Sequence, residues 1–145
     1  MRVWIFQTGE PLHIDSENSR PMRAMNLCNK LVDRGHDVVL WSSAFNHQKK
    51  IHRSRSSESI RINSNFEIRL IPSCGYKKHI GLARLVDHGQ MAINLKRLLN
   101  QEEAAPDVAF IGYPPIEAAA VFSNWLIKQN IPAMLDVKDL WPQMF

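Results

Sequence analysis

Short apolar runs and amphipathic stretches alternate along the chain. Nearly continuous hydrophobicity, typical of parallel strands covered on both faces, occurs at residues 2–8, 37–41, 107–112 and 132–137. Apolar residues at helical spacing predict helices at residues 21–34, 81–100 and 116–129. Two short alternating segments, at residues 59–63 and 66–71, predict a hairpin or an antiparallel edge piece. This order of elements predicts an α/β fold with a Rossmann-like, doubly wound and mostly parallel sheet.

The segments between the strands carry further expectations. Pro21 lies in the first turn of the first helix, and Ser19 precedes it as a plausible cap. Residues 44–59 are polar and basic and have no consistent apolar period, so we expect a loop there. In the long helix the 3.6-residue period is followed by Leu82, Leu85, Val86, Gly89, Ala92, Ile93, Lys96 and Leu99.

The composition is that of one ordinary globular domain. The chain has 145 residues, of which 45% are hydrophobic and 22% charged, and these values exclude a disordered, collagen-like or coiled-coil protein. Its 18 Lys and Arg against 14 Asp and Glu give a net charge of +4, which favours an anionic partner without identifying it. The N-terminus does not resemble a secretory signal, and no stretch approaches the ~18 apolar residues of a membrane span. We therefore expect a cytoplasmic protein.

Several kinds of chemistry lack their sequence signatures. The first strand is followed by Gly9-Glu10-Pro11 and not by GxGxxG, so a dinucleotide cofactor is not expected. The chain has no GxxxxGK[ST] phosphate loop and no GxSxG nucleophile elbow. Its cysteines, Cys28 and Cys74, fall in no metal-binding spacing. We expect neither a cofactor nor a metal in this chain.

Five segments carry a resemblance to a known family. In chain order they are TGEP, SRPMRAMNLCNKL, RGHDVVLWSSAFNHQKKIHR, GYPPIEAA and DVKDLWP, and the resemblance covers nearly the whole chain, from Val3 to Pro142. Their order resembles the N-terminal half of a GT-B glycosyltransferase of the family 4 type, in the bacterial branch that builds O-antigen and capsule. RGHDV is common to many such enzymes, whereas the FNHQKKIHR run together with DVKDLWP is more specific. Two departures are Gly9-Glu10 where a glycine pair is common, and Gln143 where an acidic residue is frequent.

The resemblance implies a two-domain, hexosyltransferase-like enzyme with its reaction in the cleft between the domains. Residues 1–145 would form the Rossmann-like, acceptor-side domain, and the C-terminal domain that binds the nucleotide-sugar donor is absent. The complete enzyme would be a retaining glycosyltransferase acting on a lipid-linked glycan in lipopolysaccharide or capsule biosynthesis, and this chain alone is expected to be inactive. The alternative is a non-catalytic binding module that docks a lipid-linked glycan or a partner chain.

Candidate site residues lie in the loops after the strands, where open α/β sheets bind ligands. Asp139, just beyond the last strand, is the candidate catalytic carboxylate, and its alternative role is a helix cap or a partner for Lys138 or Arg23. The guanidinium groups of Arg20 and Arg23 could bind an acceptor diphosphate or remain solvated. The full set of acceptor-binding candidates is Gly9, Glu10, His13, Arg20, Arg23 and Trp141.

A cluster of cations could face a membrane. Three interpretations remain open for the basic segment around residues 49–55: a solvated loop, a nucleic-acid patch, or a site for anionic phospholipid or a lipid-linked diphosphate. Few aromatic residues lie nearby, so nucleic acid is not the partner we expect. We predict peripheral contact with the anionic inner face of the plasma membrane through Lys49, Lys50, Arg53, Arg55, Lys77 and Lys78. A donor domain or a companion chain is the other expected partner.

Overall fold

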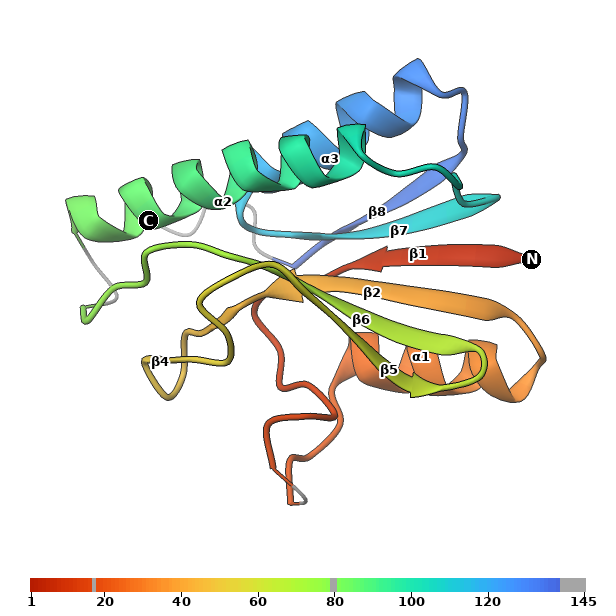
Figure 1. Ribbon diagram of the computed structural model, residues 1–145, viewed down its shortest axis with the longest axis horizontal. Coiled ribbons are helices and arrows are strands. Elements are labelled where there is room, and N and C mark those ends of the chain that lie inside the picture. Colours follow the sequence, from red (N-terminus) through yellow and green to blue (C-terminus); the bar gives the residue numbers. More distant parts are fainter. Residues whose placement is uncertain (17, 79–80, 139–145) are drawn as a thin grey trace.

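The computed structural model describes residues 1–16, 18–78 and 81–138. Its centre is a six-stranded sheet in the order β5-β6-β2-β1-β7-β8 (Figure 1). Five strands are parallel, and β5 pairs antiparallel with β6 at one edge. The strands are β1 (Arg2–Phe6), β2 (Asp37–Ser43), β5 (Glu58–Asn63), β6 (Phe66–Ile71), β7 (Val108–Tyr113) and β8 (Ala133–Val137).

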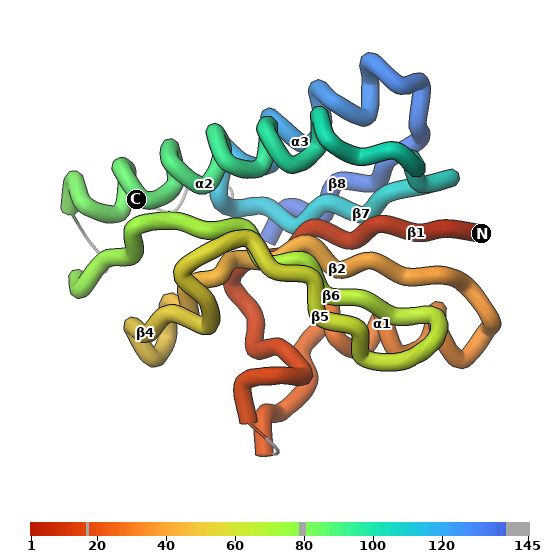
Figure 2. The backbone as a smooth tube through the Cα atoms, viewed as in Figure 1, coloured from red at the N-terminus to blue at the C-terminus, as the bar shows by residue number. Residues whose placement is uncertain are grey.

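Helices cover both faces of the sheet. Helix α1 (Arg23–Asp33) lies on one face, and α2 (Leu82–Asn100) and α3 (Ile116–Lys128) lie side by side on the other (Figures 1 and 2). The expected α/β class and the mostly parallel sheet are confirmed, and the arrangement is compatible with a Rossmann-like fold. The chain builds outward from β1 to β2 and β6, then continues on the other side with β7 and β8. The topological switch point therefore lies between β1 and β7, where ligands bind in open α/β sheets.

Strand β1 supplies apolar side chains to both layers of the core. Val3 and Ile5 pack in the layer under α1, whereas Trp4 and Phe6 pack in the layer under α2 and α3. In the second layer the Trp4 ring lies 5.3 Å from Trp41, between ring centroids, and 6.1 Å from Phe122 of α3. A strand buried on both faces has no polar side to display, which explains the nearly continuous apolar run in the sequence.

The face of α2 that packs on the domain agrees only in part with the one expected. The bounds of the helix agree with the prediction, but its buried face carries Asp87, Met91, Ala92, Leu95 and Leu99. Of the residues assigned to the apolar period, Ala92 and Leu99 are buried as expected, whereas Leu82, Leu85, Val86 and Ile93 are exposed. Two apolar stripes lie on this helix, and α3 and the sheet cover the stripe that also contains Met91 and Leu95.

The segment expected to be a loop contains a small hairpin. Strands β3 (Phe45–Asn46) and β4 (Ile51–His52) pair antiparallel in a separate two-stranded sheet. Phe45 is buried, and Gly75, with φ of +76°, packs directly against its ring, where an added Cβ would come within 2.8 Å. Two-residue strands are too short to give an apolar period, so the sequence pattern could not reveal them.

Candidate functional site

A pocket of about 290 Å³ lies at the carboxyl ends of the parallel strands. One wall follows β1 and β7, the two strands of the switch point, and consists of Gln7, Thr8, Gly9, Glu10, Pro114 and Pro115. The opposite wall comes from the first turns of α2 and from the residues before it, and includes Tyr76, Arg84, Asp87 and His88. The pocket thus occupies the place where this topology binds ligands.

Glu10 is a buried carboxylate that hydrogen-bonds the first turn of α1. It is 5% exposed, and its Oε2 accepts a hydrogen bond from the backbone N–H of Ala24 at 2.7 Å. Its other oxygen, Oε1, accepts from the Lys138 ammonium. The prediction that Ser19 caps this helix is wrong. The Ser19 hydroxyl is hydrogen-bonded to the Ser16 hydroxyl, and Glu10 accepts the backbone N–H of Ala24 in the first turn. A carboxylate here also lies at the positive end of the helix dipole.

A second ion pair joins the same elements. The Arg23 guanidinium contacts both carboxylate oxygens of Asp136 at 2.6 Å. Arg23 opens α1 and Asp136 lies in β8, so the pair fastens the start of the helix to the end of the last strand. Together with Glu10 and Lys138, it brings the first loop, the start of α1 and the segment just before Asp139 into contact.

The α2 wall of the pocket carries titratable groups. The Asp87 carboxylate is 2% exposed and accepts a hydrogen bond from the backbone N–H of Gly75 at 2.6 Å. Burial, together with the nearby Arg84 charge, holds the pKa of His88 below its ordinary value of 6.5, although Glu117 and Asp87 act in the opposite direction. His88 is therefore a neutral imidazole at pH 7, able to accept a proton from a hydroxyl group.

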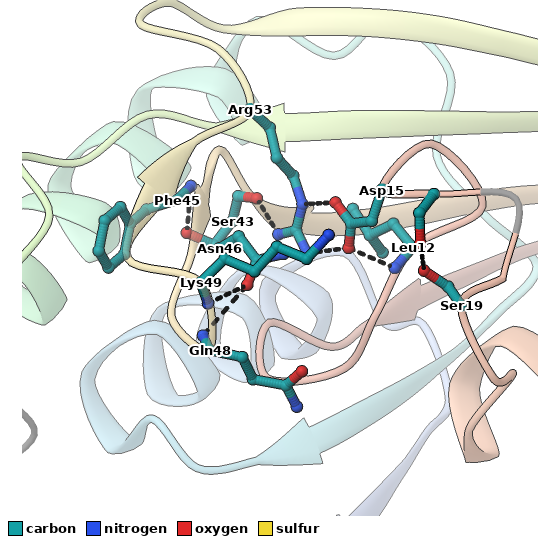
Figure 3. A network of polar contacts seen from close by, with 10 residues as sticks. Leu12, Asp15, Ser19, Ser43, Phe45, Asn46, Gln48, Lys49 and Arg53 are labelled. Atoms are coloured by element: carbon teal, nitrogen blue, oxygen red, sulfur yellow. Dashed lines mark hydrogen bonds and ion pairs between the residues drawn. The ribbon is translucent and has the colours of Figure 1, made fainter.

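A buried ion pair fixes the first loop beside the pocket (Figure 3). The Arg53 guanidinium donates to both Asp15 oxygens at 2.5 and 2.6 Å and to the Ser43 carbonyl at 2.9 Å. Burial alone would raise the pKa of Asp15, but hydrogen bonds from Arg53 and from the Leu12 N–H, with the guanidinium charge, hold it below 3.8. The Arg53 side chain is only 6% exposed. The prediction that it contacts a membrane is therefore wrong, because its charge is turned inward.

The remaining acceptor-binding candidates lie away from the pocket or outside the described residues. His13 hydrogen-bonds Asn29 at 2.8 Å and packs edge-on against Phe66, and it does not line the pocket. Arg20 is exposed and does not line it either. Trp141 falls outside the described residues, as does Asp139, the candidate catalytic carboxylate. Of the sequence candidates, Gly9 and Glu10 line the pocket.

The other members of the basic cluster have exposed or half-buried side chains. Lys50 Nζ lies 4.1 Å from the centroid of the Tyr76 ring. This cation–π contact ties the β3–β4 hairpin to the residues before α2. The exposed members are Lys49, Arg55, Lys77 and Lys78.

Gln7, one of the residues that line the pocket, packs against Gly112 of β7. Gln7, which follows β1, is buried, and its side-chain oxygen lies directly over Gly112 of β7, where any Cβ would overlap it. Only glycine leaves room for this side chain. Among the residues that the structure describes, no group of three His, Cys, Asp or Glu could hold a metal ion.

The sequence interpretation missed the α2 wall, which includes Arg84, Asp87 and His88. A usable signal was present, because Asp87 is the one acidic residue of α2 and follows a helical spacing with Met91 and Leu95. A carboxylate on an apolar stripe is costly to bury unless hydrogen-bonded, so it marks a site or a structural contact. Chemically, the pocket combines two cations, Arg84 and Lys138, with the carboxylates of Glu10 and Asp87 and a neutral imidazole, which can accept a proton from a hydroxyl group of a ligand.

Comparison with known proteins leaves the family open. Neither the family models nor the curated proteins compared with the chain include a significant match. Over the described ranges, no helix combines the length and the apolar character needed to cross a bilayer.

Proposed function

We propose that this chain is the acceptor-side domain of a retaining, nucleotide-sugar-dependent glycosyltransferase with the GT-B architecture and of the family 4 type. The complete enzyme transfers a sugar to a lipid-linked glycan for lipopolysaccharide or capsule, at the inner face of the plasma membrane. This domain binds the acceptor, and a further domain or a companion chain binds the nucleotide-sugar.

One observation carries this proposal. The Glu10–Lys138 and Arg23–Asp136 pairs bring together three segments on which the resemblance rests, TGEP, SRPMRAMNLCNKL and DVKDLWP. These segments are far apart in the sequence, yet they meet at the switch-point pocket. An acceptor in this pocket would face whatever approaches from the carboxyl ends of the strands.

The reaction divides between the two domains. The bond from the sugar to the nucleoside diphosphate breaks, and a bond forms from the same carbon to the acceptor oxygen. We assign the acceptor proton to Asp139, and the charge of the leaving diphosphate to cations of the donor-side domain. The chain by itself therefore binds acceptor without turnover.

Titration calorimetry tests the acceptor site. The probe is a short-chain polyprenyl-diphosphate-linked monosaccharide, and saturable binding is expected. The dissociation constants of UDP- and GDP-sugars should be millimolar or higher. Micromolar binding of either nucleotide would contradict the placement of the donor site, and absence of acceptor binding would contradict the proposal itself.

A pair of matched variants locates the binding. Lys138 lines the pocket, whereas Lys30 lies in the last turn of α1, at the other end of that helix. Lys138→Met removes a cation from the pocket and leaves the Glu10 carboxylate without its counter-ion, and this change of charge weakens binding of an anionic acceptor roughly 10- to 100-fold. Lys30→Met removes the same charge elsewhere and leaves affinity unchanged. Equal losses in both variants would mean that the probe responds only to net charge.

A further inference from the structure

The outer face of α2 carries an apolar stripe that nothing in the described structure covers. Leu82 is 80% exposed, Leu85 59%, Val86 63% and Ile93 56%. Their spacing of three, four and seven residues places them on one side of the helix, opposite the buried stripe that contains Met91 and Leu95. A contiguous group of large exposed apolar side chains marks an interaction surface.

The exposed charged side chains of α2 itself have one sign. Asp87 is the one acidic residue of α2, and it is buried on the opposite face against Gly75. The exposed lysines Lys77 and Lys78 precede the helix, and Lys96 and Arg97 follow the stripe on its exposed surface. An apolar stripe with cations at both ends and no carboxylate of its own helix is complementary to an anionic surface.

The position of the stripe relates it to the pocket. The first turns of α2 extend beyond the carboxyl ends of the strands (Figure 1). The same turns contribute Arg84, Asp87 and His88 to the pocket wall from the inward side of the helix. A surface bound to the outer side of these turns therefore lies one helix diameter from the pocket.

We infer that the outer face of α2 docks onto an anionic phospholipid bilayer, with Leu82, Leu85, Val86 and Ile93 inserted at the headgroup boundary and the flanking cations among the headgroups. The docking rests on the proposed function in one respect: a lipid-linked acceptor, which enters the pocket from the membrane, explains why the domain docks there. The docking site is α2 and not the segment around residues 49–55.

Vesicle sedimentation tests the docking without any sugar or polyprenyl lipid. The chain should bind vesicles of phosphatidylcholine with phosphatidylglycerol and release as salt is raised, and should bind pure phosphatidylcholine weakly. The triple variant L82Q/L85Q/I93Q should lose at least about 100-fold in partitioning, from the apolar surface that it removes. K77Q/K78Q should lose about 30-fold on anionic vesicles, because each lysine near such a surface contributes roughly 5-fold.

A matched control removes apolar surface elsewhere. M134Q/L135Q replaces exposed residues of β8 and should bind vesicles like the wild type. Circular dichroism and an unchanged thermal midpoint show that each variant is folded, as expected at exposed positions. As a second readout, brominated lipids should quench the tryptophan added by Leu85→Trp and should not quench the one added by Met134→Trp.

Three results would overturn the inference: equal losses in the α2 and β8 variants, vesicle binding that the triple variant retains, or a stripe-dependent dimer in sedimentation velocity without vesicle binding. The last would assign the stripe to a second copy of the chain. The acceptor titration contains no bilayer, so its outcome is independent of the docking test.

Discussion

The Asp15–Arg53 ion pair makes a quantitative prediction about stability. Both side chains are almost fully buried, with exposures of 4% and 6%. Asp15→Asn keeps the shape of the side chain and an oxygen that can accept the Leu12 N–H, but it leaves the guanidinium charge buried without its counter-ion. Breaking a buried pair from one side costs about 3–5 kcal/mol. For a domain of this size that loss lowers the melting temperature by roughly 10–15 °C.

Urea denaturation followed by tryptophan fluorescence measures this loss. The matched control is Arg61→Met, because Arg61 pairs with Glu67 at 3.7 Å while its own side chain is 65% exposed. An exposed pair of this kind contributes less than about 1 kcal/mol. The loss of unfolding free energy in the double variant D15N/R53M should be smaller than the sum of the losses in the two single variants, by at least about 1 kcal/mol. The reason is that the double variant also removes the buried charge.

The pH dependence of the same variant has a defined sign. The folded-state pKa of Asp15 lies below its ordinary value of 3.8, so the unfolded chain binds the proton more readily. The contribution of the pair is therefore complete above pH 3.8 and is lost as the pH falls through the folded-state pKa. The difference between wild type and D15N should shrink below pH 3.8. Equal losses for D15N and R61M at pH 7, or strict additivity in the double variant, would refute the reasoning.

Three further predictions concern the pocket and the core. Gly112→Ala places a Cβ where the Gln7 oxygen lies and should lower the unfolding free energy, measured by thermal denaturation, by about 1–3 kcal/mol. Adding Gln7→Ala should recover part of this loss. An unchanged stability of G112A would contradict the close approach. His88 has its pKa held below 6.5, so the wild type should lose stability relative to H88Q as the pH falls below 6.5, and parallel pH profiles would refute this. A thiol reagent should modify exposed Cys74 quickly and Cys28 only on unfolding, since burial raises the pKa of the Cys28 thiol to about 12; two equally fast thiols would show that Cys28 is accessible.

Local pattern predicted the elements of this fold well. The hairpin at residues 59–63 and 66–71 is the antiparallel edge pair β5–β6, and the bounds of α2 were predicted to within one residue. Hydrophobic period and turn residues are local properties, so the sequence displays them directly. The alternation of strands and helices was likewise enough to predict a mostly parallel α/β sheet.

Contacts across long stretches of sequence account for what the pattern could not predict. Glu10 replaces a local cap on α1 through a bond to Ala24, 14 residues away, and Arg53 turns inward to meet Asp15, 38 residues away. In α2 both faces carry apolar residues, so the period alone could not decide which face packs inward. Tertiary contacts decided each case, and Arg53 in particular was indistinguishable in sequence from the exposed Arg55.

The central position of β1 has a consequence for how the chain folds during synthesis. Trp4 leaves the ribosome long before Phe122 and Trp125, the two residues of α3 whose rings pack against it. Until α3 has been made, β1 and β2 expose an unpaired edge and an uncovered aromatic face, a state prone to association with other chains. The many contacts between distant parts of the sequence also slow folding. We expect nascent chains stalled before residue 126 to bind chaperones that recognise exposed aromatic surface.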